Sequence, residues 1–363
     1  MKKIHILHPY IENRLNDITN GLYPRHHLWG LEGLSNNDFV ESSLVKSNAF
    51  RIPKILERIL NKILFDDSSS LSIELTAIKA SFNCDLLYSV CGPLALARFH
   101  SKRCKLVSWV FRMPKFRKRA IFHSYKSNNL SLHDGFLCLT PNCAKDFSSF
   151  GISKFLPWCV DRNLFYPKKE CDNSPKKPFF LATGKTGRDY ATLIKAACEI
   201  NADFRIIGPI NQRPHIIPKN VKWISGTQDP PDKAIDYLTL RKWYSSCLAV
   251  CIPLDGDKDD TCGYTNMLEA MAMAKPVVMT RSGCLHIDPE KDSFGLSVNP
   301  KDKNGWIHSL NSLLNNPELT HSLGSKGLEM VNQNFTIEAF DNKIIDFLTG
   351  FLALGEENGY KTK

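Results

Sequence analysis

Long uninterrupted apolar runs are missing from this 363-residue sequence. A helix that spans a bilayer needs about 20 consecutive apolar residues, so no membrane-spanning helix is expected. The opening stretch, MKKIHILHPYIENR, contains two lysines but an apolar run too short for a secretory signal. We therefore expect a cytoplasmic protein whose contact with a membrane, if it has one, is peripheral on the cytoplasmic face.

Cysteine pairs with the spacing of a metal site are also lacking, although the chain has 12 cysteines. No CxxC occurs, and most cysteines stand in apolar runs such as GFLCLT and SSCLAVCIP. Zinc sites need clustered ligands, and disulfide frameworks belong to oxidising compartments. The expectation is therefore buried, reduced thiols and no bound metal.

Acidic residues are too few to balance the basic ones, since 47 Lys and Arg face 37 Asp and Glu, for a net charge of +10. The excess is concentrated in residues 102–126, where nine of 25 residues are Lys or Arg and aromatic residues are interleaved. Such a segment suits an anionic partner: a phosphorylated acceptor, an anionic membrane surface or nucleic acid. A solvated basic face is the alternative.

Short apolar runs alternate with helical patterns along the chain, which is typical of parallel sheets with crossover helices. The length favours two domains. The predicted strands are 4–8, 86–89, 106–111, 135–139, 179–183, 204–207, 221–225, 248–253, 277–280 and 296–298. The predicted helices include 51–65, 189–200, 238–246, 266–274, 306–314, 318–334 and 337–354. Both halves are therefore predicted to be doubly wound α/β domains.

The segment 255–280 carries the clearest chemistry. An apolar strand ending at Pro253 leads through a polar loop to Gly263 and to a helix that we expect to begin with Thr265 as its N-cap. Gly263 permits close backbone approach, and the free N–H groups and dipole of the helix favour a phosphate. Glu269 is unusual in this nearly apolar helix. Its carboxylate either accepts ribose hydroxyls beside the phosphate or pairs with a lysine or backbone groups.

The same helix carries a resemblance to a known family. The run NMLEAMAMAKPVVMT (266–280) resembles the EAMA-x-x-x-PVV block of GT-B glycosyltransferases, particularly the family 4 (group 1) retaining enzymes. Other family segments follow in order, namely FLPWCVDRNLFYP, FFLATGKTGRDYATLIKA, FRIIGP and VKWISG, so the resemblance covers roughly residues 135–345. It implies the GT-B fold, in which two Rossmann-like doubly wound domains face a central cleft.

This resemblance, with the charged and Pro-containing stretch near residue 170, predicts the domain organisation. An N-terminal acceptor-binding domain would span 1–166, a linker 167–178, and a C-terminal nucleotide-sugar-binding domain 179–336. The segment 337–363 would form a C-terminal helix that packs back on the N-terminal domain.

Roles in the donor site are also implied by the resemblance. The donor diphosphate would be held by Gly21, Lys185, Arg188, Gly263, Tyr264 and Thr265. Glu269 would bind the ribose, and Thr261 and Cys262 would border the donor sugar. No metal or other cofactor is implied, and the catalytic residue is unassigned. The activity would be hexosyl transfer from a nucleotide diphosphate sugar to a hydroxyl acceptor (a sugar or a lipid-linked sugar), with retention, in surface polysaccharide or glycolipid synthesis.

Three positions depart from the family pattern. Thr261 stands where many relatives have a first Glu, eight positions before the second, which leaves the sugar identity open. Trp109, Phe111 and Arg112 occupy the region where many relatives carry a His, while His123 lies further on. Cys159 replaces a usual Gly. In the first loop, residues 25–27 (Arg-His-His) are candidates to touch an anionic acceptor.

Three other functions compete with this one. Asp255 and Asp257 form a D-x-D, the pattern by which GT-A glycosyltransferases hold a divalent cation, but it lies past residue 250 rather than in the N-terminal half. A basic nucleic-acid-binding protein would use residues 102–126 but would leave Glu269 unexplained, and no nucleic acid partner is expected. A degenerate GT-B protein would bind its ligands without turnover.

Overall fold

The chain divides into two compact units, each described here by itself. The computed structural model describes residues 1–46, 52–53, 55–58, 61, 70–112, 128–167, 177–225, 235–256, 261–281 and 284–357. Unit 1 comprises Met1–Asn16, His27–Pro157 and Glu338–Lys363, and unit 2 comprises Asp17–His26 and Trp158–Ile337. Most of the predicted linker 167–178, most of the predicted helix 51–65 and residues 113–126 of the basic segment lie outside the described residues.

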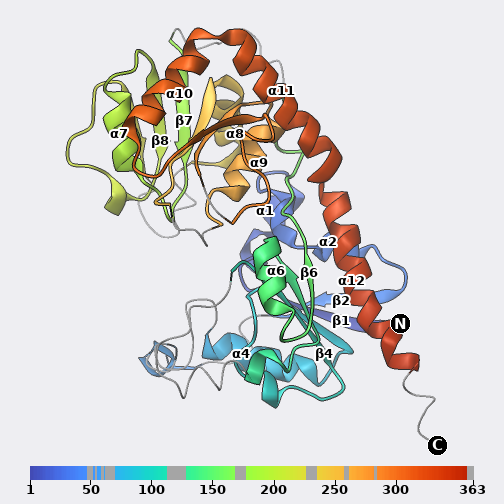
Figure 1. Ribbon diagram of the computed structural model, residues 1–363. Coiled ribbons are helices and arrows are strands. Elements are labelled where there is room, and N and C mark those ends of the chain that lie inside the picture. Colours follow the sequence, from blue (N-terminus) through green and yellow to red (C-terminus); the bar gives the residue numbers. More distant parts are fainter. Residues whose placement is uncertain are drawn as a thin grey trace, which may run out of the picture. The chain divides into compact units, whose positions relative to one another are not determined.

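Unit 1 is built on a parallel sheet with the strand order β2-β1-β3-β4-β5-β6 (Figure 1). Its strands are β1 (Lys2–Leu7), β2 (Val40–Leu44), β3 (Leu86–Ser89), β4 (Lys105–Val110), β5 (Gly135–Cys138) and β6 (Ile152–Phe155). The register places Ile4 opposite Leu86 and Leu87 opposite Leu106. The four predicted strands of this half are confirmed to within two residues, and the two edge strands, β2 and β6, were not predicted.

The helices of unit 1 begin at residues suited to the task. They are α1 (Leu15–Thr19, which runs on into unit 2), α2 (Leu31–Ser35), α4 (Leu71–Ser81), α6 (Pro141–Phe147) and α12 (Ile337–Glu357, which enters from unit 2). Three short 3-10 segments accompany them: η1 (Glu12–Arg14), η2 (Arg25–Leu28) and η3 (Ala97–Phe99). Ser70 caps α4 by accepting the Ile73 N–H, and Thr140 caps α6 by accepting the Cys143 N–H.

The last helix, α12, packs against unit 1 by close backbone approach (Figure 1). A Cβ placed on Gly135 of β5 would lie 2.5 Å from the Phe351 ring, so only glycine fits beneath that aromatic side chain. The Gly33 N–H donates to the Asp341 carboxylate at 3.0 Å. These contacts make the helix part of the core of unit 1.

Unit 2 repeats the architecture with the strand order β12-β11-β10-β7-β8-β9 (Figure 1). Its strands are β7 (Phe179–Thr183), β8 (Asp203–Ile207), β9 (Val221–Ile224), β10 (Ala249–Ile252), β11 (Val277–Thr280) and β12 (Gly295–Val298). Its helical segments are α7 (Tyr190–Ala197), η4 (Ile210–Gln212), α8 (Tyr237–Ser246), α9 (Tyr264–Ala272), α10 (Lys303–Asn315) and α11 (Pro317–Asn334). All six strands predicted for this half are confirmed.

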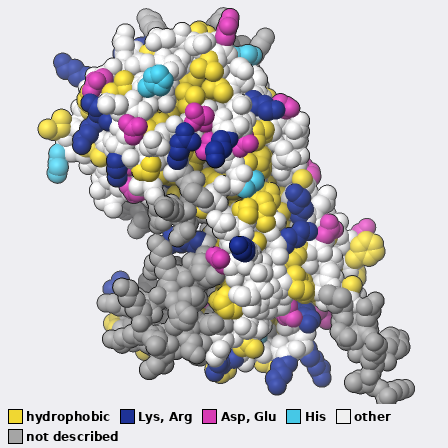
Figure 2. All heavy atoms as spheres, in the orientation of Figure 1, with side chains coloured by type: hydrophobic (Ala, Val, Ile, Leu, Met, Phe, Trp, Pro, Cys, Tyr) yellow, Lys and Arg dark blue, Asp and Glu magenta, His cyan; other side chains and the backbone are white. Residues whose placement is uncertain are grey.

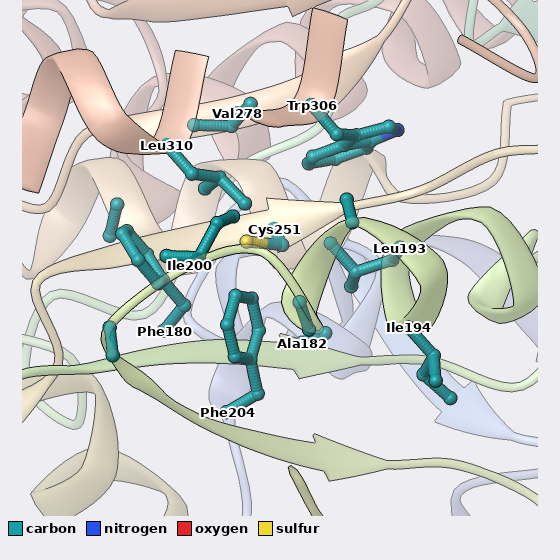
Figure 3. Close-up of a cluster of buried hydrophobic side chains, with 14 of the residues drawn as sticks. Phe180, Ala182, Leu193, Ile194, Ile200, Phe204, Cys251, Val278, Trp306 and Leu310 are labelled. Carbon is teal, nitrogen blue, oxygen red and sulfur yellow. The ribbon is translucent and has the colours of Figure 1, made fainter. Parts of the chain in front are cut away.

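The core of unit 2 joins the sheet to two of its helices (Figure 3). Phe180 and Phe204 lie on neighbouring strands with ring centroids 5.3 Å apart. Leu193 of α7 and Trp306 of α10 complete the layer on this face. Burial of such side chains contributes about 1.5–3 kcal/mol each, which makes the sheet a rigid base for the loops at its edge.

Two further expectations concern cysteines and membranes. The eleven cysteines within the described ranges are all free thiols, and most are buried. Across those same ranges, no helix combines the length and the apolarity that crossing a bilayer requires.

Candidate functional site

The predicted donor residues other than Gly21 lie at one edge of the unit 2 sheet. The chain leaves β7 towards β8 and β9, and then returns to place β10 on the other side of β7. In an open parallel sheet, ligands bind at the carboxyl ends of the strands where the order reverses in this way. Lys185 and Arg188 follow β7, and the segment 261–269 follows β10. The topology therefore gathers them at the reversal point.

The loop after β7 is shaped by two glycines. Gly184 has a φ of +144° and Gly187 a φ of +63°, backbone conformations that residues other than glycine rarely adopt. A Cβ on Gly184 would overlap the Arg188 guanidinium, so the glycine makes room for that group. Lys185 between them is exposed, and its carbonyl accepts the Gln212 side-chain amide at 2.9 Å.

Arg188 is buried in this loop and reaches the next element. Its Nη1 donates to the Thr186 carbonyl at 2.9 Å, and its Nε and Nη2 each donate to the Thr183 carbonyl at 3.4 Å. Its Nη2 also donates to the Asn266 side chain at 2.8 Å. The guanidinium is thus fixed next to the first turn of α9, where it places a permanent positive charge.

The loops after β7 and β10 are bonded to each other. The Asp255 N–H donates to the Gly187 carbonyl, and the Asp189 N–H to the Pro253 carbonyl, both at 3.0 Å. Lys301 bridges the carboxylates of Asp189 at 3.1 Å and Asp255 at 3.2 Å. The first carboxylate of the D-x-D pattern is therefore paired with a lysine, and its second, on Asp257, lies outside the described residues.

The start of α9 differs from the prediction. The helix begins at Tyr264 with Gly263 as its N-cap, so the prediction of Thr265 as the N-cap was wrong. Gly263 has a φ of +88°, and a Cβ there would lie 2.5 Å from Ile252 Cγ2, while the Tyr264 side chain is buried. The turn into the helix thus needs glycine two residues before the predicted N-cap, and Thr265 becomes part of the first turn.

The first turn of α9 offers backbone donors. The Tyr264 N–H donates to the Thr261 carbonyl at 3.4 Å. The N–H groups of Thr265 and Asn266 find no acceptor among the described residues, as expected at a helix start. Thr261 and Cys262 are half-buried and lead directly into this turn. Donors of this kind, with the helix dipole behind them, suit an anion.

Glu269 lies one turn further into α9 and is 2% exposed. Its Oε2 accepts the Tyr244 hydroxyl at 2.8 Å and the Asn266 side-chain amide at 3.5 Å. The partners are therefore neither a lysine nor backbone groups, which corrects that alternative. Because Asn266 also accepts from Arg188, one amide connects the guanidinium to the carboxylate.

Burial dominates the chemistry of this carboxyl group. Desolvation raises the pKa of Glu269 from 4.5 to about 7, while the hydrogen bonds from Tyr244 and Asn266 act in the opposite direction. A glutamate that changes charge near neutral pH, beside an anion-binding turn, is typical of a functional site.

Gly21 belongs to unit 2 and ends α1. Its φ is +67°, its N–H donates to the Ile18 carbonyl, and the Leu22 N–H donates to the Asp17 carbonyl, which together form a Schellman motif. A Cβ on Gly21 would meet no atom within 4 Å. The glycine is thus explained by the helix end, and nothing of the chain crowds its surroundings.

Asp161 fixes the segment that carries Gly21. Its carboxylate accepts the Arg25 N–H at 2.8 Å, and its own N–H donates to the ring Nδ1 of His26 at 3.2 Å. His26 is 1% exposed and stacks on Phe165. The contacts among Arg25, His26 and Asp161 therefore fix the loop that follows Gly21.

In unit 1 the residues that replace the family's His lie in and after β4. Trp109 is fully buried and contacts Phe340 edge-on, with ring centroids 5.5 Å apart. Phe111 is 38% exposed and Arg112 is exposed, whereas His123 lies outside the described residues. His8, which directly follows β1, is fully buried and contacts Trp29 edge-on, and desolvation lowers its pKa to about 4.

Sequence analysis missed Tyr244 and Asn266, which complete the site around Glu269. Asn266 stands in the quoted block, three residues before Glu269, so its position on the same helix face was a usable signal. Tyr244 lies in another helix, α8, and no local pattern connects it to α9. Its pairing with Glu269 appears only in three dimensions.

Comparison with known proteins agrees with this geometry. Residues 186–316 match the family model of the glycosyl transferases group 1. No relative of the chain is found by sequence among curated proteins. The match begins within the loop after β7, leaves out Gly184 and Lys185, and covers Arg188, β8, β9, β10 and all of α9.

Solved structures cover nearly the whole chain. The sucrose-phosphate synthase of Thermosynechococcus elongatus superposes with a TM-score of 0.70 at 17% identity, covering 98% of this chain and 100% of that one. Anabaena HepE in complex with UDP gives 0.62 at 13% identity, covering 96% and 100%. A glycosyltransferase of Rickettsia africae gives 0.62 at 12% identity, covering 97% and 98%.

These matches confirm the resemblance seen in the sequence. The chain has the GT-B fold, with two Rossmann-like units, each on a six-stranded parallel sheet. Within unit 2, residues 186–316 are similar to the group 1 glycosyl transferases.

Proposed function

We propose that this protein is a group 1 glycosyltransferase that moves a hexosyl group from a nucleotide diphosphate sugar to a hydroxyl acceptor, with retention of configuration. The observation that carries the proposal is the joining of Arg188, the first turn of α9 and Glu269 through Asn266 at the strand-order reversal of unit 2. Structures of Anabaena HepE, which shares the fold, hold UDP, UDP with glucose, and UDP-glucose. A nucleoside diphosphate fits the same arrangement here.

Each group has a chemical role in this proposal. Arg188 and Lys185, with the amides of residues 263–265, stabilise the negative charge that grows on the departing diphosphate. Gly21 leaves space for the donor phosphates, and Glu269 accepts the ribose hydroxyls. Positive charge from protein side chains makes a metal ion unnecessary in this scheme.

The finer parts of the function rest on fewer residues. Thr261 and Cys262 would border the donor sugar, and the Thr in place of Glu leaves one hydroxyl acceptor fewer for that sugar. This substitution also favours a second candidate, a protein that binds a nucleotide-sugar without turnover. The proposed context is surface polysaccharide or glycolipid synthesis at the cytoplasmic face of a membrane.

Peripheral contact with an anionic membrane through residues 102–126 is part of the proposal. Phe82 is 67% exposed and Phe99 is 55% exposed, and both stand beside basic residues at the amino-terminal edge of the unit 1 sheet. The Ser101 N–H donates to the Ser81 hydroxyl at 3.0 Å, which brings the two segments together. Exposed aromatic and basic side chains suit the headgroup region of a bilayer.

Nucleic acid is the weaker alternative for these basic residues. On the described face shown in Figure 2, Lys and Arg side chains are interspersed with Asp and Glu rather than gathered in a stripe. Sedimentation with vesicles of anionic lipid, compared with neutral vesicles, tests the membrane. Loss of binding is expected for Phe82→Ser with Phe99→Ser, and binding to random oligonucleotides instead of vesicles would contradict the proposal.

The donor site is tested by calorimetry and thermal shift with UDP, GDP, ADP and CMP, each without metal and with Mg²⁺ or Mn²⁺. We expect one nucleoside diphosphate to bind without metal, and Glu269→Ala to weaken it at least about tenfold. Glu199→Ala is the matched control, because Glu199 follows α7 at the opposite edge of the sheet and pairs with Lys303.

Other outcomes would overturn specific parts of the proposal. A strict need for the metal would favour the D-x-D pattern. No nucleotide binding by a well-folded protein would refute the donor site. Binding without release of nucleoside diphosphate from any nucleotide-sugar, in the presence of sugar or lipid-linked acceptors, would favour the protein without turnover.

A further inference from the structure

Tyr244 is a fully buried tyrosine whose hydroxyl group reaches the candidate site from another helix. Its hydroxyl donates to Glu269 Oε2 at 2.8 Å, which is the shorter of the two hydrogen bonds given to that carboxylate. Its ring is held edge-on by Phe165, with centroids 5.8 Å apart and planes at 90°. The hydroxyl therefore has a fixed direction, towards the carboxylate.

A phenol in this position favours the ionised carboxylate over the neutral one. A carboxylate is a stronger acceptor than a carboxylic acid, so a donated hydrogen bond stabilises the charged form. The amide of Asn266 adds a second, longer bond to the same oxygen at 3.5 Å. Without these donors, the charged form of Glu269, whose side chain is 2% exposed, would bear the full desolvation penalty.

We propose that Tyr244 is a positioning residue for donor binding: its hydroxyl, assisted by Asn266, keeps Glu269 in the charged form that accepts the ribose hydroxyls. The inference rests on the proposed function, because it assigns the carboxylate to the nucleotide. It adds that the affinity for the nucleotide depends on pH near neutrality. It also adds that Tyr244, which lies in α8 rather than in the helix of Glu269, sets the midpoint of this pH dependence.

Among the described residues, two further groups bear on this pair. Cys247, just after α8, acts on the Tyr244 hydroxyl, and Arg188 reaches Asn266 from the loop after β7. From α11, Gly327 packs on α9, and glycine brings no charge. Burial of Glu269 places its pKa at about 7, so ionisation is incomplete at neutral pH. The affinity is then expected to rise as the pH increases through this value.

The test is the affinity for UDP from pH 6 to pH 9 in wild type, Tyr244→Phe and Tyr88→Phe. Removing the hydroxyl while keeping the ring moves the midpoint of Glu269 upwards by about one pH unit, since a hydrogen bond to a charged group is worth about 1.5 kcal/mol or more. Tyr244→Phe therefore binds UDP about tenfold more weakly than wild type at pH 6, and within about twofold at pH 9. Ionisation of UDP itself affects all variants alike, so their ratio isolates the protein.

Tyr88→Phe is the matched control. Tyr88 is also fully buried, but it lies in unit 1 and its hydroxyl has no hydrogen-bond partner within the described part of the chain. Its UDP binding should follow that of wild type at every pH. If GDP or ADP proves to be the nucleotide that binds, the same series is run with it.

Direct titration of the carboxyl group separates this inference from the proposed function. Carbon-13 NMR of glutamate-labelled protein, with Glu269→Gln to assign the signal, should show a higher midpoint in Tyr244→Phe than in wild type without any nucleotide. A loss of UDP affinity in Tyr244→Phe that is equal at all pH values, or an unchanged midpoint, overturns the role of Tyr244. Absence of nucleotide binding by wild type overturns the proposed function and the role in donor binding together, while the titration still reports whether Tyr244 sets the charge.

Discussion

Glu269→Gln should make the protein more stable at pH 8 and hardly change it at pH 4.5. The wild-type carboxyl group is 2% exposed, and desolvation raises its pKa from 4.5 to about 7. Below pH 4.5 the group is neutral in both the folded and the unfolded chain. Between these two values the unfolded chain loses its proton first, so the stability of wild type falls as the pH rises, and above about 7 the loss is complete.

The size of this loss follows from the two pKa values. A difference between 4.5 and about 7, at 1.36 kcal/mol per pH unit, corresponds to about 3 kcal/mol. Glutamine is nearly the same size, cannot ionise, and can still accept the Tyr244 hydroxyl through its amide oxygen. The variant should therefore gain up to about 3 kcal/mol over wild type at pH 8, or about 2–4 °C in Tm for each kcal/mol.

The free energy of unfolding is measured by urea titration, and Tm is measured separately by calorimetry, both at half-unit steps from pH 4.5 to pH 8. Glu199→Gln serves as the control, because it removes an exposed ion pair with Lys303 worth about 0–1 kcal/mol. The reasoning is refuted if Glu269→Gln differs from wild type by the same amount at all pH values, or is the less stable protein at pH 8. A gain in stability with a loss of UDP affinity would identify a residue kept for function at a cost in stability.

Four shorter predictions follow from other parts of the structure. Gly263→Ala should lower the free energy of unfolding by more than about 2 kcal/mol in urea titrations, because its Cβ would meet Ile252 at 2.5 Å as well as a φ of +88°. Gly21→Ala, with a φ of +67° and no atom within 4 Å, should cost only the backbone strain of about 1 kcal/mol. Arg188→Lys should weaken UDP at least about tenfold by calorimetry with an unchanged pH profile, since lysine cannot reproduce the planar fork of donors. Circular dichroism should show steep loss of stability as the pH falls from 6.5 to 4, because burial lowers the pKa of three histidines to about 4; they are His8, His100 and His133.

Most strands were predictable from the sequence, whereas the two edge strands of unit 1 were not. The central strands of both units are mainly short apolar runs, because parallel strands covered on both faces are poor in polar residues. The edge strands β2 and β6 have the sequences VESSL and ISKF, in which exposed positions alternate with less exposed ones. Four or five residues of that kind occur equally often in loops, so only pairing with β1 and β5 defines them.

The candidate site divides in a similar way. The glycine turn before α9 was predictable, because Gly263 and the apolar block after it lie in one continuous segment. Its N-cap was misplaced by two residues, because a Thr hydroxyl can accept a first-turn N–H, whereas the positive φ of Gly263 and its close contact with Ile252 appear only in the structure. The partners of Glu269 depend on how α8 packs, and a hydrogen bond between residues 25 positions apart leaves no local trace.

Because α12 follows unit 2 in the sequence but belongs to unit 1, it affects the order in which the two units can complete folding during synthesis. Residues of unit 2 leave the ribosome as nearly one uninterrupted block, whereas unit 1 waits for residues 338 onwards. The strands of the unit 1 sheet are translated before α12. Until α12 is made, Gly135 lacks the Phe351 ring that packs over it, and the Gly33 N–H lacks the Asp341 carboxylate to which it donates. Synthesis should thus allow unit 2 to finish folding before unit 1, with an interval in which the apolar surface of unit 1 depends on slow collapse or on a chaperone for protection.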